Sequence, residues 1–186
     1  MPFTEVPIPG LLVFEPAVFA DSRGFFFESY NEKNFQAQGI NEHFVQDNQS
    51  KSGYGVVRGL HYQLNPFAQT KLVRVLVGSI LDVAVDIRRN SPTYGKVFSI
   101  ELSAENKKQL YIPKGFAHGF SVLSETAEVL YKCDNFYNKQ SEGGILLDDA
   151  DLNIDWQIPA NDLILSDKDK KNSRFADIQV NFEFDA

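Results

Sequence analysis

The chain has 186 residues, with 18 lysines and arginines against 25 aspartates and glutamates, and a net charge of −7. This acidic balance argues against a nucleic-acid polymer as partner, because phosphate neutralisation requires clustered cations. The 43% hydrophobic and 13% aromatic content argues against disorder, and the length is typical of a single domain over residues 1–186.

The cysteine content and the pattern of apolar residues indicate in which cellular compartment the protein works. Cys133 is the only cysteine, which excludes an internal disulfide and favours a reducing compartment. Residues 1–10 lack the basic and apolar regions of a signal peptide, and no long apolar run predicts a membrane span. We therefore expect a cytoplasmic protein with no membrane partner.

Short strands dominate the predicted first quarter of the chain. Apolar patterning predicts strands at residues 11–14, 25–30 and 43–50. Asn31 can cap a short helix that Gly39 ends. Three pairs of side chains stand out: Phe19 and Arg23 in a predicted loop at 16–24, Phe26 and Glu28 on one face of the second strand, and Gln46 and Asn48 on one face of the third.

The chain is organised around residues 56–71, VVRGLHYQLNPFAQTK. They place Arg58, His61 and Gln63 on one predicted strand and Lys71 at the start of the next. Strict alternation would put Arg58 and His61 on opposite faces of that strand. If both enter one cavity, Gly59 must form a bulge or kink, which a glycine inside a strand often marks.

His61 and Lys71 together would suit carbanion chemistry. An imidazole gains and loses a proton near neutral pH, so it can remove a proton from carbon. An ammonium beside it can stabilise the negative charge that is left on oxygen. The structural alternative is an edge histidine bonded to water and a solvated lysine, and these two residues alone do not decide between the readings.

The second half continues the strand pattern. Strands are predicted at residues 80–87, 97–102, 120–123 and 128–133, and residues 109–112 lead into a tight turn at 113–119. Strands about 8 to 12 residues apart, with glycine turns and few helices, predict an all-β sandwich or barrel. The strand that begins at Lys71 is apolar on both faces, so we expect a second sheet on one side and a partner subunit over part of the other.

The element PKGFAHG, which carries His118, and the earlier strand with His61 resemble the two motifs of the cupin jelly roll. Many cupins bind a metal at such positions, using a first motif close to His-x-His and a downstream glutamate. Here Gln63 stands two residues after His61 and the downstream glutamate is missing, which leaves too few ligands for a transition metal. We predict a site without a metal and expect no cofactor.

A more specific resemblance covers most of the chain. The motifs DSRGFFFES, QDNQSKS, RGLHYQ, DVAVDIRRNSPTYGK, IPKGFAHGF, VLYKC and LSDKD follow one another in this order. The combination resembles the dTDP-4-dehydrorhamnose 3,5-epimerases. It implies a cupin-type jelly roll with a few short helices, and an isomerase that epimerises dTDP-4-dehydro-6-deoxy-D-glucose at C3 and C5 to dTDP-4-dehydro-L-rhamnose for deoxysugar biosynthesis.

The resemblance also implies catalytic roles. His61 matches the base, Asp169 the carboxylate that orients it, Lys71 the cation near the C4 oxygen, and Tyr131 the proton donor on the opposite face. A carboxylate suits this place because it sets the imidazole tautomer and stabilises the imidazolium. Considered without the resemblance, Asp169 would be a solvated loop charge and Tyr131 a packed sheet aromatic.

Substrate binding is implied in the same way. Arg23 and Arg58 match the residues that clamp the diphosphate, and Phe19 and Tyr137 match the aromatics that stack on thymine. The other implied substrate-binding residues are Phe26, Glu28, Gln46, Asn48 and His118. In the family Arg23 and Phe19, among others, reach across from the partner subunit, so a homodimer with shared sites is implied. The structural alternative for His118 is a satisfied core histidine.

Other functions use overlapping sets of residues. A non-catalytic cupin that binds nucleotide sugars would explain the arginines and aromatics, and a metal-dependent cupin would explain the two histidines. Within the enzyme class, a 3-only or 5-only epimerase and a 3,4-ketoisomerase use nearly the same side chains. Tyr137 also stays open as an alternative to Tyr131 for the proton donor.

Overall fold

The computed structural model describes residues 2–184, which form thirteen strands and one α-helix. One sheet contains β1 (Phe3–Glu5), β2 (Leu12–Phe14), β5 (Gln46–Gly53), β7 (Lys71–Val77), β10 (Gln109–Ile112) and β12 (Thr126–Cys133). A second contains β6 (Val57–Gln63), β8 (Ser79–Asp86), β9 (Val97–Ser103), β11 (Phe116–Val122) and β13 (Glu142–Gly144). Outside them lie β3 (Phe19–Asp21), β4 (Gly24–Phe26) and α1 (Glu32–Ala37). Single-turn 3₁₀ helices follow at Lys139–Ser141, Ala160–Asp162, Asp169–Lys171 and Phe175–Asp177.

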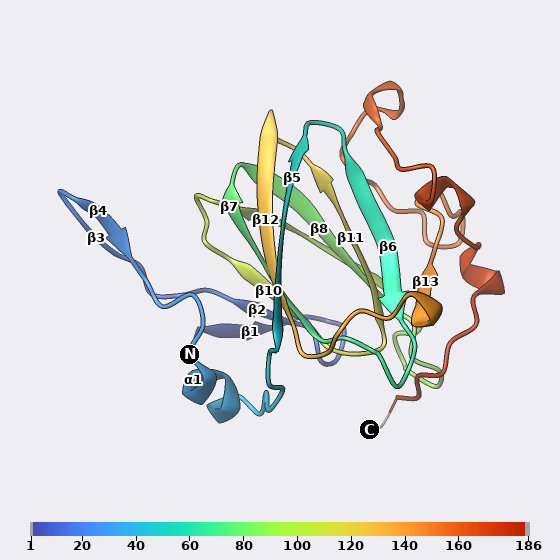
Figure 1. Ribbon diagram of the computed structural model, residues 1–186, viewed down its shortest axis with the longest axis horizontal. Helices are drawn as coiled ribbons and strands as arrows, with labels where there is room; N and C mark the ends of the chain where they lie inside the picture. The colour runs from blue at the N-terminus through green and yellow to red at the C-terminus, as the bar shows by residue number, and fades with distance from the viewer. Residues whose placement is uncertain (1, 185–186) are drawn as a thin grey trace.

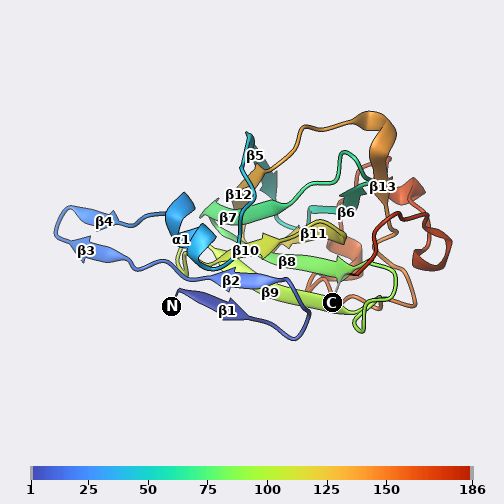
Figure 2. The ribbon, with the colours of Figure 1, turned by 90° about the horizontal axis from the view of Figure 1, so that it is seen from below.

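Two antiparallel sheets make the body of the molecule (Figures 1 and 2). Their strand orders are β1-β2-β10-β7-β12-β5 and β13-β6-β11-β8-β9, while β3 and β4 pair only with each other. Strands distant in the sequence, such as β2 and β10, are therefore neighbours, as a jelly roll requires. This arrangement confirms the predicted all-β, cupin-type sandwich. Among residues 2–184, no helix has the length and apolar character needed to cross a membrane.

Apolar side chains fill three separate layers. Between the sheets, Val73 and Val75 of β7 pack against Ile80 of β8 and its neighbours. On the outer side of the five-stranded sheet, a second cluster includes Trp156 and Phe182, so the C-terminal part of the chain covers that face. This cover is the orange and red segment beside β6 and β13 in Figure 1. It lets the second sheet bury apolar residues on both faces.

Helix α1 covers part of the outer face of the six-stranded sheet. The Asn31 side chain accepts a hydrogen bond from the backbone N–H of Lys33, as predicted for a helix cap. Phe35 is buried against Phe14 of β2 and Tyr111 of β10. The predicted helix is therefore confirmed. Packing of the single buried residue Phe35 stabilises this short helix against the sheet.

The segment around Arg23 differs from the prediction. Residues 16–24, expected to be a loop, contain β3 and the turn of a β3–β4 hairpin that projects from the body (Figures 1 and 2). Gly24 has a φ of 133°, and Asp21 accepts a hydrogen bond from the Arg23 backbone, so these residues make the turn. Strand β4 ends at Phe26, so the expected shared face of Phe26 and Glu28 is wrong.

Two further predicted boundaries are wrong. Strand β11 begins at Phe116, so His118 lies within a strand and not in the expected tight turn. Strand β5 begins at Gln46 and runs to Gly53, later than the expected residues 43–50. In both places pairing with a neighbouring strand extends the β-structure beyond the local apolar pattern, which is how tertiary context overrides propensity.

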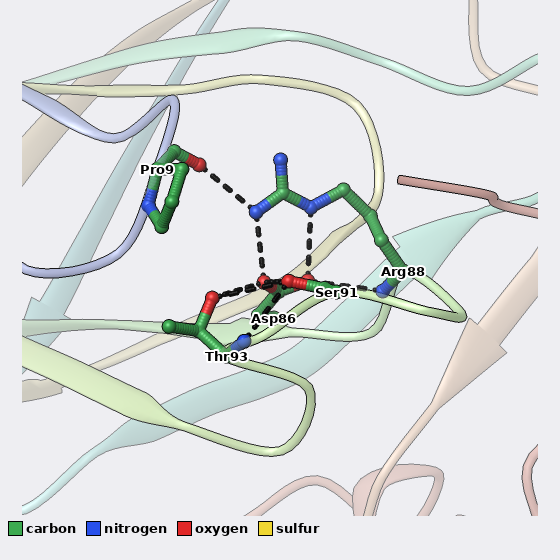
Figure 3. A network of polar contacts seen from close by, with 5 residues as sticks. All are labelled: Pro9, Asp86, Arg88, Ser91 and Thr93. Atoms are coloured by element: carbon green, nitrogen blue, oxygen red, sulfur yellow. Dashed lines mark hydrogen bonds and ion pairs between the residues drawn. The ribbon is translucent and has the colours of Figure 1, made fainter. Parts of the chain in front are cut away.

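A polar network closes the end of the sandwich near the N-terminal segment (Figure 3). The buried Asp86 carboxylate accepts hydrogen bonds from Arg88 and from the hydroxyls of Ser91 and Thr93. Burial by itself would raise the pKa of Asp86, but these hydrogen bonds hold it below its ordinary value. Arg88 also donates to the Pro9 carbonyl, which ties the N-terminal turn to β8. The Asp86, Arg88, Ser91 and Thr93 side chains of the DVAVDIRRNSPTYGK motif therefore stabilise the fold at this end of the sandwich.

Candidate active site

A cavity of about 460 Å³ opens between the two sheets, within the size range of small-molecule sites. Its polar lining includes Arg58 and His61 from β6, His118 from β11, Lys71 from β7 and Tyr131 from β12. The first three come from the five-stranded sheet and the last two from the six-stranded sheet. Side chains from facing sheets can therefore approach a ligand from opposite sides.

A bulge in β6 places Arg58 and His61 in the same cavity. In the pairing of β6 with β11, His61 faces His118 and Arg58 faces Phe120. Gly59 and Leu60 of β6 therefore stand opposite the single Gly119. The extra residue shifts the in–out alternation of side chains by one position, so Arg58 and His61 point to the same side of the strand. Gly59 adopts a φ of 123° at this point. The predicted irregularity at Gly59 is confirmed.

His61 pairs with a carboxylate from a distant part of the chain. Its Nε2 lies 2.6 Å from Oδ1 of Asp169, a residue with only 4% of its surface exposed. Burial lowers the pKa of His61, and the positive charges of Lys71 and Lys168 act in the same direction, while Asp169 opposes them. The imidazole is thereby held neutral at pH 7, in the form that can accept a proton. Asp169 is buried, so it is not a solvated loop charge.

Lys71 and Tyr131 enter the cavity from the sheet opposite His61. The Nζ atom of Lys71 lies 5.9 Å from the centroid of the Tyr131 ring. Burial lowers the pKa of Lys71, because an ammonium loses solvation inside the protein. Burial raises the pKa of Tyr131, so its phenol stays protonated at neutral pH and can donate. This pair combines a poorly solvated cation with an acid.

His118 belongs to a second buried pair. Its Nε2 lies 2.7 Å from Oδ1 of Asp82, and both residues are buried. His118 and His61 are also direct partners in the β11–β6 pairing. Asp82 is not among the functional residues that the sequence predicts. The signal that could have identified it was a carboxylate inside an otherwise apolar strand.

A smaller adjoining cavity of about 200 Å³ shares His61, Lys71 and Tyr131 with the first. It is also lined by Gln46, Asn48, Gln63, Tyr137 and Glu142. The Tyr137 hydroxyl donates to Glu142 over 2.9 Å, and Lys168 forms an ion pair with the same carboxylate.

Three polar neighbours of the site were missed in the sequence. They are Glu142, Lys168, and Ser52, whose hydroxyl accepts a hydrogen bond from Nε of Arg58 over 3.1 Å. Lys168 stands next to Asp169 in LSDKD, so that motif could have indicated it. Nothing local marks Glu142, which reaches the cavity only because β13 pairs with β6.

Four of the predicted binding residues lie away from these cavities. Phe19, Arg23 and Phe26 line a separate hollow on the β3–β4 hairpin. The Arg23 side chain is 88% exposed and pairs with Asp21, while Glu28 accepts a hydrogen bond from Asn31. A single chain therefore does not bring these four residues to His61.

No group of three or more histidine, cysteine, aspartate or glutamate side chains within residues 2–184 is arranged to hold a metal ion. His61 and His118 are each already engaged by a carboxylate, Asp169 and Asp82 respectively.

A jelly roll with a carboxylate-paired histidine on one wall of the cavity, and a lysine and a tyrosine on the other, defines a cupin-type isomerase site. A family model described as dTDP-4-dehydrorhamnose 3,5-epimerase matches residues 5–177. The chain belongs to this family.

Known relatives match the chain over nearly its whole length. The dTDP-4-dehydrorhamnose 3,5-epimerase of Shigella flexneri is 58% identical over 174 residues, covering 93% of this chain and 95% of its own. The crystal structure of dTDP-6-deoxy-D-glucose-3,5-epimerase from Legionella pneumophila, in complex with dTDP-4-keto-L-rhamnose, is 45% identical with a TM-score of 0.95 and covers 99% and 98% of the two chains. A 3′-monoepimerase from Streptomyces bikiniensis in complex with dTDP-quinovose is 31% identical with a TM-score of 0.85, covering 92% and 86%.

Proposed function

We propose that this protein epimerises dTDP-4-dehydro-6-deoxy-D-glucose at C3 and C5, giving dTDP-4-dehydro-L-rhamnose for dTDP-L-rhamnose or related deoxysugar biosynthesis. The observation that carries the proposal is the placement of His61 and Tyr131 on facing sheets around one cavity. Inversion at carbon requires proton removal on one face and proton delivery on the other, and these two residues approach from opposite sides.

His61 is the base in this proposal. The C4 ketone of the substrate acidifies the protons on C3 and C5, and neutral His61 removes one of them. The electron pair of the broken C–H bond then moves onto the C4 oxygen as an enolate. Asp169, 2.6 Å from the imidazole, stabilises the imidazolium that forms, and Lys71 stabilises the oxyanion.

Tyr131 completes the inversion. Its phenol donates a proton to the opposite face of the carbon, and the enolate returns to the ketone. Solvent then returns a proton to the tyrosinate and takes the proton from the His61 imidazolium, so both residues regain their starting forms. The raised pKa of Tyr131 keeps this proton in place until the enolate forms. The sequence is repeated at the second carbon, and it requires no cofactor.

Arg58 and Tyr137 hold the nucleotide in this proposal. A guanidinium suits the diphosphate, and the hydrogen bond to Ser52 orients it inside the cavity. The half-exposed Tyr137 ring offers a face on which thymine can stack. The Legionella relative was crystallised with dTDP-4-keto-L-rhamnose, which supports a nucleotide-linked keto sugar as substrate here.

A homodimer with shared sites is part of the proposal. Phe19 and Phe26 are 67% and 68% exposed on a projecting hairpin, an unfavourable place for large apolar side chains in water. If the hairpin of one subunit reaches the cavity of another, it brings Arg23, Phe19 and Phe26 to the nucleotide.

The decisive experiment is incubation with dTDP-4-dehydro-6-deoxy-D-glucose in D₂O, followed by NMR of the product. We expect one solvent deuterium at each of C3 and C5, together with inversion at both. Exchange at one carbon only would identify a single-site epimerase, like the Streptomyces bikiniensis relative by its name. Binding with no exchange would contradict the enzyme proposal.

Chelation tests the metal-free part of the proposal. Because Gln63 occupies the position where a metal-binding cupin would have a second histidine, we expect full turnover after prolonged EDTA treatment. Turnover that is lost with EDTA and restored by a divalent metal would contradict it.

A further inference from the structure

The carboxylate that contacts His61 comes from a segment outside both sheets. We call residues 164–173 the strap. At the start of the strap, Ile164 forms an isolated β-bridge with Val56, just before β6. At the end of the strap, Ser173 forms an isolated β-bridge with Ile145, just after β13. Asp169 lies between these anchors in a single 3₁₀ turn, so the sheets themselves do not hold it.

A close contact near Asp169 joins the strap to the sheet. Gly144 of β13 is the direct partner of His61, so a side chain at position 144 would share the face of the imidazole. The amide end of Asn172 fills this space: its Cγ, Oδ1 and Nδ2 lie 2.5–2.6 Å from where a Cβ on Gly144 would stand. The Asn172 amide therefore occupies space that is free only because residue 144 is a glycine.

The seated amide belongs to the same turn as the carboxylate. The backbone N–H of Asn172 donates to the Asp169 carbonyl over 3.3 Å, and its Nδ2 contacts the Ile145 carbonyl at 3.5 Å. Ser166 holds the other side of the turn, where its hydroxyl accepts from the Asp169 N–H over 3.0 Å. A displacement of Asn172 would be transmitted to Asp169 over three residues.

We infer that Asn172, seated on Gly144, is a positioning residue that sets the contact between Asp169 and His61. Catalytic pairs must be held to within about 0.5 Å, and side chains locked by packing provide this precision. The expected effect of Asn172 on turnover rests on the proposed function, whereas its expected effect on the protonation of His61 does not.

The protonation of His61 reports on this contact. The charged or titratable groups that face it are Asp169 and Lys168 from the strap, Lys71 from β7, Glu142 from β13, and Arg58, His118 and Tyr131 around the cavity. Of the strap residues, Asp169 raises the pKa of His61 and Lys168 lowers it. A longer Asp169–His61 contact should therefore lower the pKa of His61.

The test is a Gly144→Ala variant followed by imidazole NMR against pH. The φ of Gly144 is open to alanine, so the new methyl acts by displacing Asn172 and not by straining the backbone. We expect the pKa of His61 to fall below that of the parent protein, because Asp169 is the group of the strap that raises it. The chain has three histidines, and a His61→Ala spectrum assigns the signal.

Two further variants separate this contact from a general disturbance. In Gly144→Ala/Asn172→Ala the methyl has room, so we expect the pKa of His61 to return most of the way to that of the parent protein. Asn172→Ala alone should lower it by less than Gly144→Ala. The matched control is Gly143→Ala, whose methyl would meet the Tyr62 ring, and it should leave the pKa of His61 unchanged.

Each outcome decides the inference. An unchanged pKa in both Gly144→Ala and Asn172→Ala overturns it, as does an equal fall in the Gly143 control. A fall that the double variant does not reverse also overturns it, because the methyl would then act on His61 directly. If the pKa behaves as expected while the acidic limb of kcat/KM does not move with it, the positioning contact stands and the role of His61 as base is wrong.

Discussion

Asp169 determines how readily the neighbouring His61 holds a proton. Burial and the cations Lys71 and Lys168 lower the pKa of His61, and the carboxylate raises it. In the proposed mechanism His61 acts as base only in its neutral form, so activity should be lost as pH falls through this lowered pKa. We therefore expect the acidic limb of kcat/KM below pH 6.5, the ordinary value for histidine.

Replacing Asp169 by asparagine should shift that limb. The variant removes the negative charge that raises the pKa of His61, so the acidic limb of kcat/KM should move to lower pH. The maximal rate should fall roughly 10- to 100-fold, the usual cost of losing an orienting partner. A limb that stays in place or moves to higher pH would show that Asp169 does not set the protonation of His61.

Tyr131→Phe should separate proton exchange from inversion. His61 and Lys71 can still form and stabilise the enolate, but only water can now protonate the opposite face. Product inversion should therefore fall further than deuterium incorporation, when both are measured in one reaction in D₂O. Tyr137→Phe is the comparison variant. If its inversion falls further instead, Tyr137 is the donor.

The bulge in β6 is the element on which the site depends. Gly59 has a φ of 123°, and a Cβ there would lie 2.5 Å from the Cα of Gly119. Gly59→Ala should therefore lower the free energy of unfolding by at least about 2 kcal/mol, through backbone strain and the clash.

Gly53 at the end of β5 offers the control for that prediction. The nearest atom to a Cβ at Gly53 is 3.8 Å away, so Gly53→Ala should change stability by no more than about 0.5 kcal/mol. Denaturant unfolding of the two variants measures both effects. Equal stabilities would show that the β6 bulge does not require glycine.

At the level of the whole molecule, the projecting hairpin separates the predicted binding residues from the cavity of the same chain. If sites are shared between subunits, His61→Ala and Arg23→Ala chains should complement each other. A mixed dimer then contains one site with both residues intact. Random pairing of equal amounts should restore about a quarter of parental activity.

The complementation measurement uses two differently tagged chains, produced together and purified through both tags. The mixed dimers isolated in this way should have about half the activity of the parent dimer, since one of two sites is intact. Two chains that both carry His61→Ala provide the control. No recovery in the mixed dimers would mean that Arg23 acts within its own chain, or away from the site.

Much of the β-architecture could be predicted from the sequence because strand patterning is local. Alternation and apolar runs are set by neighbouring residues, so the strand predicted at residues 97–102 lies within one residue of the bounds of β9, and the start of β7 at Lys71 was correct. The cap at Asn31 is equally local. Strand β3 has only three residues, too few to carry a periodic pattern, and it was predicted as part of a loop.

The sequence by itself determined the strand-rich fold, the family resemblance, and the identities of His61, Lys71 and Tyr131 as candidates for acid–base chemistry. Only the tertiary structure decided that Asp169, 108 residues from His61, is buried against it, and that a bulge puts Arg58 on the same side. It also decided that Glu142 and Asn172 flank the site. The reason is physical: periodicity is set by residues a few positions apart, whereas these contacts depend on how strands register and how the strap crosses the edge of the sheet.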